Sequence, residues 1–536
     1  QGDHQHVLVD LHHGAMAHVQ HMVVVGIPTT DLLEGQGALL RQAGGAAVRQ
    51  DHCPGPRLLG QFLQGSFLLG VMDPETGTFV EPLRKVASGL GGSSPEGPHF
   101  YKIGDYYYMY STDAIFRENR KEAKEKGVPL GFIQMRRSKD LVNWEFLGWA
   151  LPEIPQEAVE WVRSHAGGHG ATNIWAPYII PYNNKYRLYY CVSAFGRKTS
   201  YIGLAESDSP EGPWTLAGCA AKTDDTTAMN AIDPTITVDP SNGKWWMHYG
   251  SFFGGLYCVE LNPETGLPML DGDRGHLVAR RANYKKDNLE APEIIYNPDL
   301  KEYYLFVSYD PLMTTYNVRV GRSDKAEGPF IDYFGKELKD TTNNFPILTA
   351  PYRFKNHSGW AGTAHCAVFT SDDGQYFMAH QGRLSPQNQM MDLHVRQVFF
   401  TKDGWPVVSP ERYAGSNPRE FSAADLVGEW EIIRVQEPLY ERKLEAGQIL
   451  WGEGELQDEE WNMSHLLYLE KDGKLGEDQG TWDFAKEDQS LQLTLNGEVV
   501  RNLIVFAGHD WENETETVLF TGLDSRGRSV WGKRTK

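Results

Sequence analysis

Side chains that could serve in catalysis or substrate binding recur at corresponding places in this sequence, ten to thirteen residues before each of five aromatic runs. The residues at these places are Glu96, Trp175, Asp233, Glu290 and His365. If they converge, their carboxylates could cleave a glycosidic bond, because that reaction needs a protonated acid for the leaving oxygen and a base for water. We therefore ask which elements would bring them together.

Two of these carboxylates have local sequences that suit the chemistry. Glu290 lies in Leu289-Glu-Ala-Pro-Glu-Ile-Ile-Tyr, where the proline sets the entry to a strand and the apolar neighbours favour a protonated carboxyl group. Such a group is a suitable general acid. Asp233, in Ala231-Ile-Asp-Pro-Thr-Ile, belongs to the preceding repeat, and like charges at short range disfavour joint ionisation. A lone carboxylate more often caps a turn, but recurrence at one place favours a site.

The aromatic runs define the elements that would position these residues. They begin at Tyr106, Tyr186, Trp245, Tyr303 and Tyr376, at intervals of 80, 59, 58 and 73 residues. Each run follows a turn signal rich in Asn, Asp, Gly or Pro, so each is predicted to be the second strand of a hairpin. Five such sheet units predict a five-bladed β-propeller, whose innermost strands converge on a central axis.

The chain divides into three predicted parts of an all-β protein. Residues 1–90 form a leader of unclear structure, with six of the 18 histidines in the first 21 residues but no cysteine near them at ligand spacing. Residues 91–420 form the propeller. Residues 425–536 alternate polar and apolar side chains, as in Ser490-Leu-Gln-Leu-Thr-Leu, and predict a small antiparallel β-barrel or sandwich.

Composition excludes several classes of partner. The chain has 51 basic and 71 acidic residues, a formal charge of −20, and no cluster of Lys and Arg that would bind nucleic acid or an anionic membrane surface. No apolar stretch is long enough for a transmembrane helix. Five scattered cysteines indicate neither a zinc site nor a disulfide framework. Residues 1–25 lack the features of a signal peptide. We expect the protein to be a monomer.

Aromatic residues near the predicted strand starts could form a surface for sugars. Trp175, Phe195, Phe253 and Tyr309 would supply the flat apolar faces on which sugar rings stack. Any one of them alone is more often a core residue. Four beside strand starts favour substrate binding.

Several longer segments carry a family resemblance. They include Asn173-Ile-Trp-Ala-Pro, Ala231-Ile-Asp-Pro, Tyr249-Gly-Ser-Phe-Phe, Glu290-Ala-Pro, Thr315-Tyr-Asn-Val-Arg-Val-Gly-Arg-Ser and Asp403-Gly-Trp-Pro. In these segments, which span about residues 105–420 in order, the chain resembles the family 43 glycoside hydrolases and, within them, the endo-α-1,5-L-arabinanases. The C-terminal part resembles the β-barrel module that follows the propeller in many arabinanases.

The resemblance implies a function and roles for single residues. It implies inverting hydrolysis of α-1,5-L-arabinan, with Glu290 as the acid and Asp233 as the residue that tunes it. It adds Asn173 and Ser251 to the substrate-binding set. It also implies that His365, in Gly362-Thr-Ala-His-Cys, helps to hold a hydrated ion, often calcium. Because arabinan is a plant cell-wall polymer too large to enter cells, a secreted, periplasmic or cell-surface location is expected.

The catalytic base departs from the family pattern. The family has an aspartate immediately before a proline at the first strand entry, whereas this chain has Gly97 there, in Ser94-Pro-Glu-Gly-Pro-His. Glu96, one position earlier, is a longer-armed replacement base, a displaced acid motif, or a loop residue like Glu211 and Glu327. Residues 66–107 resemble instead the acid-bearing blade of family 43 β-xylosidases and arabinofuranosidases. Two alternatives therefore stay open: an exo-acting arabinofuranosidase or xylosidase of the same fold, and an impaired arabinan-binding propeller.

Overall fold

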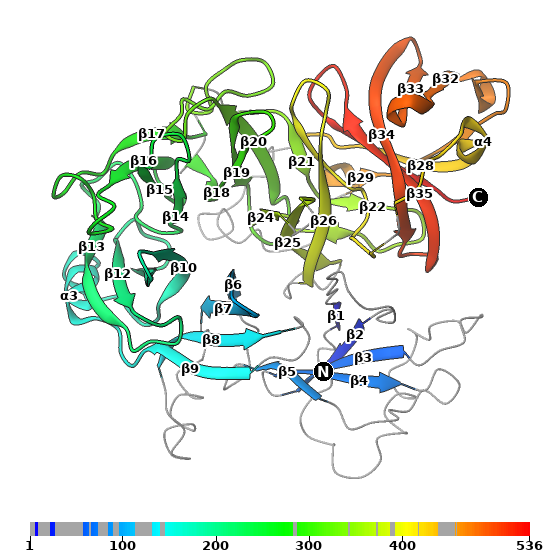
Figure 1. Cartoon of the computed structure of the whole chain (residues 1–536). Helices are drawn as coiled ribbons and strands as arrows, with labels where there is room; N and C mark the ends of the chain where they lie inside the picture. The colour runs from blue at the N-terminus through cyan, green and yellow to red at the C-terminus, as the bar shows by residue number, and fades with distance from the viewer. Residues whose placement is uncertain are drawn as a thin grey trace. The chain divides into compact units, whose positions relative to one another are not determined.

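In a computed structural model, antiparallel strands make up most of the described chain (Figure 1). The chain divides into two compact units, one of residues 1–159, 171–192 and 205–216 and one of residues 160–170, 193–204 and 217–536. The structure describes residues 6–8, 22–26, 57–63, 66–72, 84–88, 96–112, 131–139, 145–281, 287–340, 343–370, 374–385, 392–415, 418–437, 456 and 458–536.

Four sheets of four strands each follow one another along the chain, and in every one the strands are hydrogen-bonded in chain order. This arrangement is typical of propeller blades and confirms the all-β class. The strands are β6 (Glu96–Ile103), β7 (Tyr106–Thr112), β8 (Phe132–Ser138) and β9 (Glu145–Leu151); β10 (Trp175–Tyr182), β11 (Lys185–Ser193), β12 (Ser200–Ser207) and β13 (Thr215–Thr223); β14 (Thr235–Val238), β15 (Trp245–Tyr249), β16 (Leu256–Leu261) and β17 (His276–Ala279); β18 (Leu289–Asn297), β19 (Glu302–Tyr309), β20 (Asn317–Ser323) and β21 (Ile347–Thr349).

The aromatic runs form the second strands, as predicted. β7, β11, β15 and β19 each pair antiparallel with the strand that precedes them. The turn between β10 and β11 shows why the turn signals work: Asn183 and Asn184 have φ values of 43° and 63°, which asparagine tolerates better than most residues.

The last part of the repeat differs from the other four. β24 (Ala367–Thr370), β25 (Tyr376–Leu384), β26 (Asp392–Phe400) and β27 (Pro406–Val408) pair in turn, so the fifth aromatic run is again a second strand. These strands belong to a seven-stranded sheet with β22 (Tyr352–Arg353), β23 (Trp360–Ala361) and β29 (Asn462–Met463). The number of blades, predicted as five, therefore stays a prediction.

The C-terminal region is a closed barrel rather than a sandwich. Its interior is filled by large apolar side chains, among them Trp430, Leu493 and Phe520, which are fully buried. The barrel strands are β28 (Gly428–Arg434), β30 (His465–Leu469), β31 (Lys474–Leu475), β32 (Gly480–Ala485), β33 (Ser490–Leu495), β34 (Glu498–Asp510), β35 (Thr515–Leu523) and β36 (Ser529–Arg534); helix α4 (Ala423–Leu426) precedes them, and the 3-10 turns are η2 (Asp458–Glu460), η3 (Gly476–Asp478) and η4 (Lys486–Asp488).

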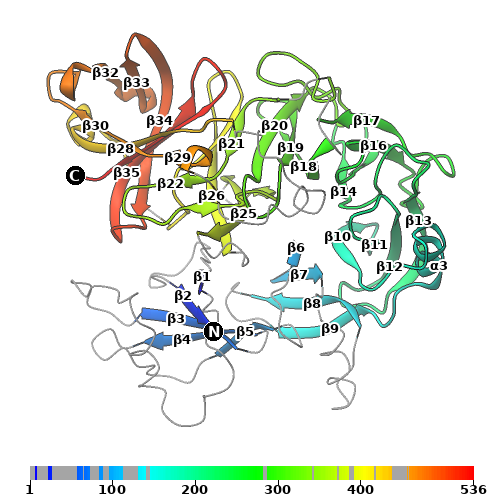
Figure 2. The same cartoon turned by 180° about the vertical axis from the view of Figure 1, so that it is seen from behind.

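The barrel is tied to the seven-stranded sheet by hydrogen bonds and a buried charge cluster. Thr521 Oγ1 donates to the Val408 carbonyl at 2.7 Å. Lys533 Nζ lies 2.8 Å from Glu411 Oε1 and 3.0 Å from Asp510 Oδ1, and it also contacts Glu512. Figures 1 and 2 show the barrel, in orange and red, beside β21, β22 and β26. These contacts hold the barrel and the sheet together within the second unit.

Two elements were not expected from the sequence. Helix α3 (Gln156–His165) lies between β9 and β10, and its Trp161 indole donates to the Thr223 carbonyl at 3.0 Å. Within the predicted leader, runs of Leu, Val and Phe form a five-stranded sheet, because such residues favour strands. Its strands are β1 (His6–Leu8), β2 (Met22–Gly26), β3 (Arg57–Leu63), β4 (Ser66–Met72) and β5 (Arg84–Ser88).

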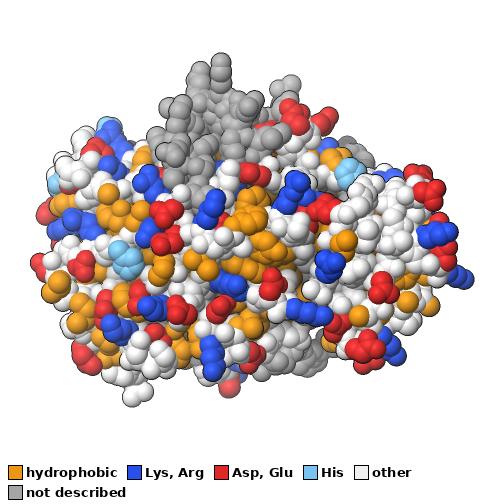
Figure 3. All heavy atoms as spheres, turned by 90° about the horizontal axis from the view of Figure 1, so that it is seen from above, with side chains coloured by type: hydrophobic (Ala, Val, Ile, Leu, Met, Phe, Trp, Pro, Cys, Tyr) orange, Lys and Arg blue, Asp and Glu red, His pale blue; other side chains and the backbone are white. Residues whose placement is uncertain are grey.

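The described surface has mixed charge. On the face shown in Figure 3, Lys and Arg side chains lie scattered between Asp and Glu side chains and apolar atoms. None of the described helices is long and apolar enough to span a membrane.

Candidate active site

The entries to three first strands of the second unit share one backbone feature. Asp233, Ala291 and His365 have φ values of 54°, 52° and 54°, in the left-handed region that residues other than glycine rarely adopt. Such conformations cost free energy and cluster at functional sites. When the strand entries are aligned on this left-handed residue, Asp233 and His365 correspond to Ala291, which is one residue beyond Glu290. The expectation that all the predicted site residues share one position is thus corrected to two adjacent positions.

Glu290 is held by two hydroxyl groups. Ser251 Oγ donates to Glu290 Oε2 at 2.8 Å, and the Tyr316 hydroxyl donates to Glu290 Oε1 at 2.6 Å. The residue lies opposite Ser308 in β19, just before a bulge in β18, and its side chain is half-buried. Both carboxylate oxygens are thus fixed in direction while the group stays accessible.

Tyr316 connects the two predicted carboxylates. Its phenol is fully buried, and this burial together with the charges of Glu290 and Asp233 raises its pKa well above the ordinary value. The phenol therefore stays protonated and remains a hydrogen-bond donor. Sequence reasoning missed this residue because it counted carboxylates. A signal existed: the start of β18, the end of β19 and the start of β20 lie at the same end of an antiparallel sheet, and Tyr316 immediately precedes β20.

A chain of hydrogen bonds supports Ser251 from behind. Ser193 Oγ and Ser200 Oγ lie 2.7 Å apart, and Ser200 Oγ donates to Asn230 Oδ1 at 2.6 Å. Asn230 Nδ2 in turn donates to the Ser251 carbonyl at 3.1 Å. Ser193, Ser200, Asn230 and Ser251 are all buried, so the network fixes the turn that presents the Ser251 hydroxyl to Glu290.

His365 lies on the neighbouring strand entry. Its backbone N–H donates to Ser308 Oγ at 2.8 Å, and Ser308 is the residue opposite Glu290. The imidazole is exposed. Among the described residues, the one group of three possible metal ligands is Glu411, Asp510 and Glu512, which does not include His365.

A second carboxyl group lies one step further along β18. Glu293 Oε1 accepts a hydrogen bond from the Val368 backbone N–H at 3.2 Å, and its carboxyl group also bonds the Thr235 side chain. Burial raises the pKa of Glu293 to about 8, so the group is protonated at neutral pH. Thr235 follows Asp233 by two residues and Val368 follows His365 by three. Glu293 therefore ties together the three strands that carry the site.

The aromatic residues predicted to bind sugar have different surroundings. Phe195 is 58% exposed, and Phe253 lines a cavity in the same unit. Tyr309 is fully buried, and its hydroxyl donates to Asn344 Oδ1 at 2.7 Å. The guanidinium groups of Arg319 and Arg281 lie over its ring, 4.6 and 5.6 Å from the ring centre. Tyr309 is therefore a core residue, and the prediction that it offers a face to substrate is corrected.

The remaining predicted residues lie in the first unit. Asn173 Oδ1 accepts from the Ile174 N–H at 2.9 Å, and Trp175 pairs with Cys191 at the start of β10. Glu96 pairs with Thr112 at the start of β6, in the same register that Glu290 has with Ser308. The side chain of Glu96 lies outside the described part of the structure.

Two family models match the chain. The model for glycosyl hydrolases family 43 matches residues 127–406, and that for a C-terminal lipocalin-like domain matches residues 410–532. An extracellular endo-alpha-(1->5)-L-arabinanase of Thermotoga petrophila is 28% identical over 486 residues, which cover 82% of this chain and 93% of the relative. A solved structure of an endo-1,5-alpha-L-arabinanase from the same organism is 26% identical, covers 82% of this chain and 98% of its own, and has a TM-score of 0.67.

Exo-acting relatives also match. An extracellular exo-alpha-(1->5)-L-arabinofuranosidase of Cellvibrio japonicus is 30% identical over 329 residues, which cover 58% of this chain and 85% of the relative. A non-reducing end alpha-L-arabinofuranosidase of Bacteroides ovatus is 90% identical over only 50 residues, which cover 9% of this chain and 10% of the relative. The expectation that residues 66–107 resemble the acid-bearing blade of β-xylosidases and arabinofuranosidases stays a prediction.

Proposed function

Because the chain belongs to glycosyl hydrolases family 43, we propose that it hydrolyses α-1,5-L-arabinan at internal bonds with inversion at the anomeric carbon. The observation that carries this proposal is the fixed carboxyl group of Glu290, held by Ser251 and Tyr316 with Asp233 acting on the same phenol. Relatives from Thermotoga petrophila and Bacillus subtilis that carry the name endo-arabinanase support the substrate and the endo mode.

In this mechanism Glu290 is the general acid. It gives its proton to the glycosidic oxygen while the bond between that oxygen and the anomeric carbon breaks. A water molecule attacks the anomeric carbon from the opposite face and gives its proton to a base. Ser251 and Tyr316 hold the carboxyl group of Glu290 in direction. Asp233 has the modulating role that the family resemblance implies.

Glu96 is the proposed base. Its backbone position corresponds to that of Glu290 in another sheet, and Gly97 follows it where the family has aspartate. The alternatives are a displaced acid motif and a loop glutamate, and either would leave a protein that binds arabinan but cleaves it slowly, because a general base contributes about 10²–10⁴-fold to the rate.

Two further features of the proposal are structural. We assign β24–β27 to a fifth blade, supported by their pairing in chain order. The calcium ion implied by the family resemblance is a weaker fit: calcium takes six to eight oxygen ligands, and His365 offers only an exposed imidazole. Water would supply most ligands at such a site, and no catalytic step is assigned to an ion.

The relatives of this protein that are named extracellular support action outside the cell.

Product analysis tests the function. Debranched arabinan is incubated with the wild type, Glu290→Gln and Glu96→Gln, with Glu487→Gln as a control in the barrel, where the side chain is exposed. A ladder of short arabino-oligosaccharides that is lost in the first two variants and kept in the control is expected. Release of arabinose alone would favour the exo-acting alternative. Binding of the polymer without any release would favour the impaired propeller.

A further inference from the structure

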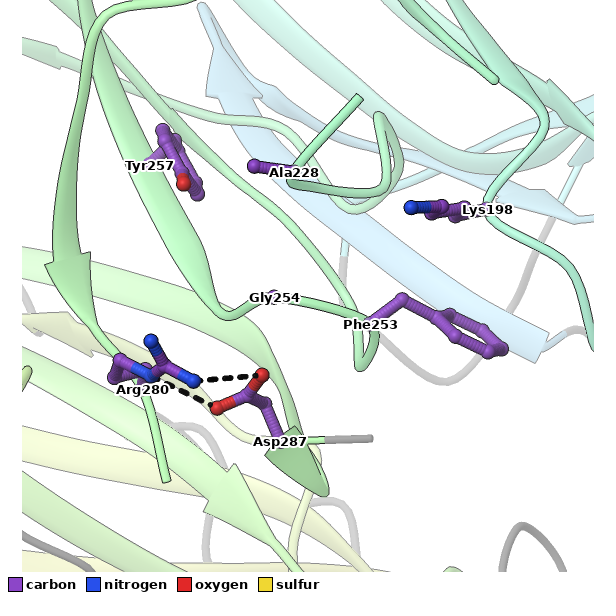
Figure 4. Close-up of a pocket in the computed structure, with 7 residues that line it drawn as sticks. All are labelled: Lys198, Ala228, Phe253, Gly254, Tyr257, Arg280 and Asp287. Atoms are coloured by element: carbon purple, nitrogen blue, oxygen red, sulfur yellow. Dashed lines mark hydrogen bonds and ion pairs between the residues drawn. The ribbon is translucent and has the colours of Figure 1, made fainter. Parts of the chain in front are cut away.

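A cavity of about 400 Å³ lies in the second unit next to the turn that carries Ser251. Figure 4 shows its lining: Phe253 and Lys198 on one side, Tyr257 on another, and the ion pair of Arg280 and Asp287 below. Volumes of this size are typical of sites for small molecules. The mechanism described above does not use this cavity.

The turn 250–255 joins the cavity to the acid. The Gly250 N–H donates to the Ile232 carbonyl at 2.8 Å, beside Asp233, and the Phe252 N–H donates to the Leu289 carbonyl at 2.7 Å, beside Glu290. Ser251 faces Glu290, whereas Phe253, two residues later, lines the cavity. One short segment therefore carries both a residue that holds Glu290 and residues that line the cavity.

One wall of the cavity is formed by close backbone packing between Gly254 and Ala228. Gly254 has φ +127°, and a Cβ atom there would lie 1.6 Å from the Ala228 carbonyl oxygen. Only glycine allows this approach. Lys198 Nζ donates to the Thr227 carbonyl at 2.6 Å, which fixes its ammonium group at the rim. The cavity is thus shaped by tight backbone contacts.

The lining has the chemistry of a sugar site. Arg280 Nε lies 3.1 Å from Asp287 Oδ1, and this pair offers donors and an acceptor side by side, a set that matches adjacent hydroxyl groups. The Arg280 side chain is 40% exposed, so it is accessible to a ligand. Tyr257 and Phe253 contribute aromatic rings that can pack against the apolar face of a furanose.

We infer that this cavity is a subsite for an arabinofuranosyl unit of the substrate chain, away from the bond that is cleaved. The inference rests on the proposed function. Arg280 and Asp287 bind the hydroxyl groups of that unit, and Tyr257 packs against its ring. A substrate long enough to reach the cavity gains affinity, whereas a short substrate does not.

Kinetics with two chain lengths test the subsite. The ratio of kcat/KM for arabinohexaose to that for arabinotriose is measured for the wild type, Arg280→Ala and Tyr257→Ala. The control is Lys244→Ala, in the exposed pair with Glu260 of the same sheet. We expect the ratio to fall about tenfold in Arg280→Ala and Tyr257→Ala, equivalent to about 1.4 kcal/mol, and to stay unchanged in Lys244→Ala. A ratio that is unchanged in all variants would overturn the inference.

A binding measurement separates the inference from the proposed function. If the wild type releases no product from either oligosaccharide, the proposed function fails, and calorimetry with Glu290→Gln still tests the cavity. Arabinohexaose should bind Glu290→Gln about tenfold more tightly than it binds the double variant with Arg280→Ala. Equal affinities would show that the cavity takes no sugar.

Discussion

The Tyr316 hydroxyl donates a 2.6 Å hydrogen bond to Glu290 Oε1, from a fully buried phenol that also experiences the charge of Asp233. The phenol thus supplies the hydrogen bond to one oxygen of the proposed acid. Because its pKa is raised, the phenol keeps its own proton and cannot accept the proton that Glu290 must deliver. A neutral donor in this place orients the carboxyl group throughout the reaction.

Removing this hydroxyl should slow the chemical step. Tyr316→Phe keeps the ring and its packing but loses the hydrogen bond, and leaving one partner of such a bond unsatisfied costs about 1–3 kcal/mol. We expect kcat to fall at least about tenfold with little change in KM. Tyr249→Phe is the matched control, since that buried phenol donates at 2.8 Å to the Arg274 carbonyl, away from Glu290. A loss confined to KM would argue against a role in positioning the acid.

Ser251 and Tyr316 should act as a unit. Each donates to a different oxygen of the same carboxyl group, so the second loss falls on an acid that is already misoriented. In a double-mutant cycle with Ser251→Ala and Tyr316→Phe, the combined effect on kcat should be smaller than the product of the single effects, by about 0.5 kcal/mol or more. Strict additivity would indicate that the two hydroxyl groups have independent roles.

Glu293 should make stability fall as pH rises. Burial raises its pKa in the folded protein to about 8 from an ordinary value of 4.5, so unfolding at neutral pH releases a proton. The stabilisation is complete below pH 4.5, is lost progressively up to about pH 8, and amounts to a few kcal/mol on this scale. Glu293→Gln keeps the neutral hydrogen bonds and removes this slope.

Thermal denaturation midpoints at pH 5 and pH 8 check this prediction. From pH 5 to pH 8 the midpoint temperature should fall further for the wild type than for Glu293→Gln. The exposed control Glu487→Gln should show the same fall as the wild type. Glu293→Ala should lower kcat even at pH 6, because it releases the strands that carry Asp233 and His365. Equal pH slopes for the wild type and Glu293→Gln would refute the protonated state.

Lys533 should be essential for the junction of barrel and sheet. Its ammonium group is fully buried among Glu411, Asp510 and Glu512, and Lys533→Met would leave these three buried carboxyl groups without their shared partner. Breaking a buried pair in this way costs about 3–5 kcal/mol. Lys474→Met removes a solvent-exposed pair with Asp472 and should destabilise the protein far less. Urea denaturation measures the free energy of unfolding of both variants. A similar loss of stability in Lys533→Met and Lys474→Met would contradict a structural role for the cluster.

Local pattern determined much of the architecture. The aromatic runs and their turn signals are local properties, because strand formation depends on side chains at alternate positions and turns on a few residues such as Asn183 and Asn184. The second strands, the repeated four-stranded sheets and the all-β C-terminal region followed from them. Closure of the C-terminal strands into a barrel did not, since it depends on the pairing of β28 with β36, far apart in sequence.

The candidate site was predictable only in part. Glu290, Asp233 and Ser251 could be named from the sequence, because each lies in a short motif at a strand entry or turn. Tyr316 was missed, because its role arises from the return of a third strand to the edge where the first begins, and only its place just before β20 pointed to that edge. Nor could the burial of Tyr309 or of Glu293 be known, because each depends on side chains from other strands packing against it. Motifs specify which groups are available, and tertiary packing decides which of them face solvent, share a partner or hold a proton.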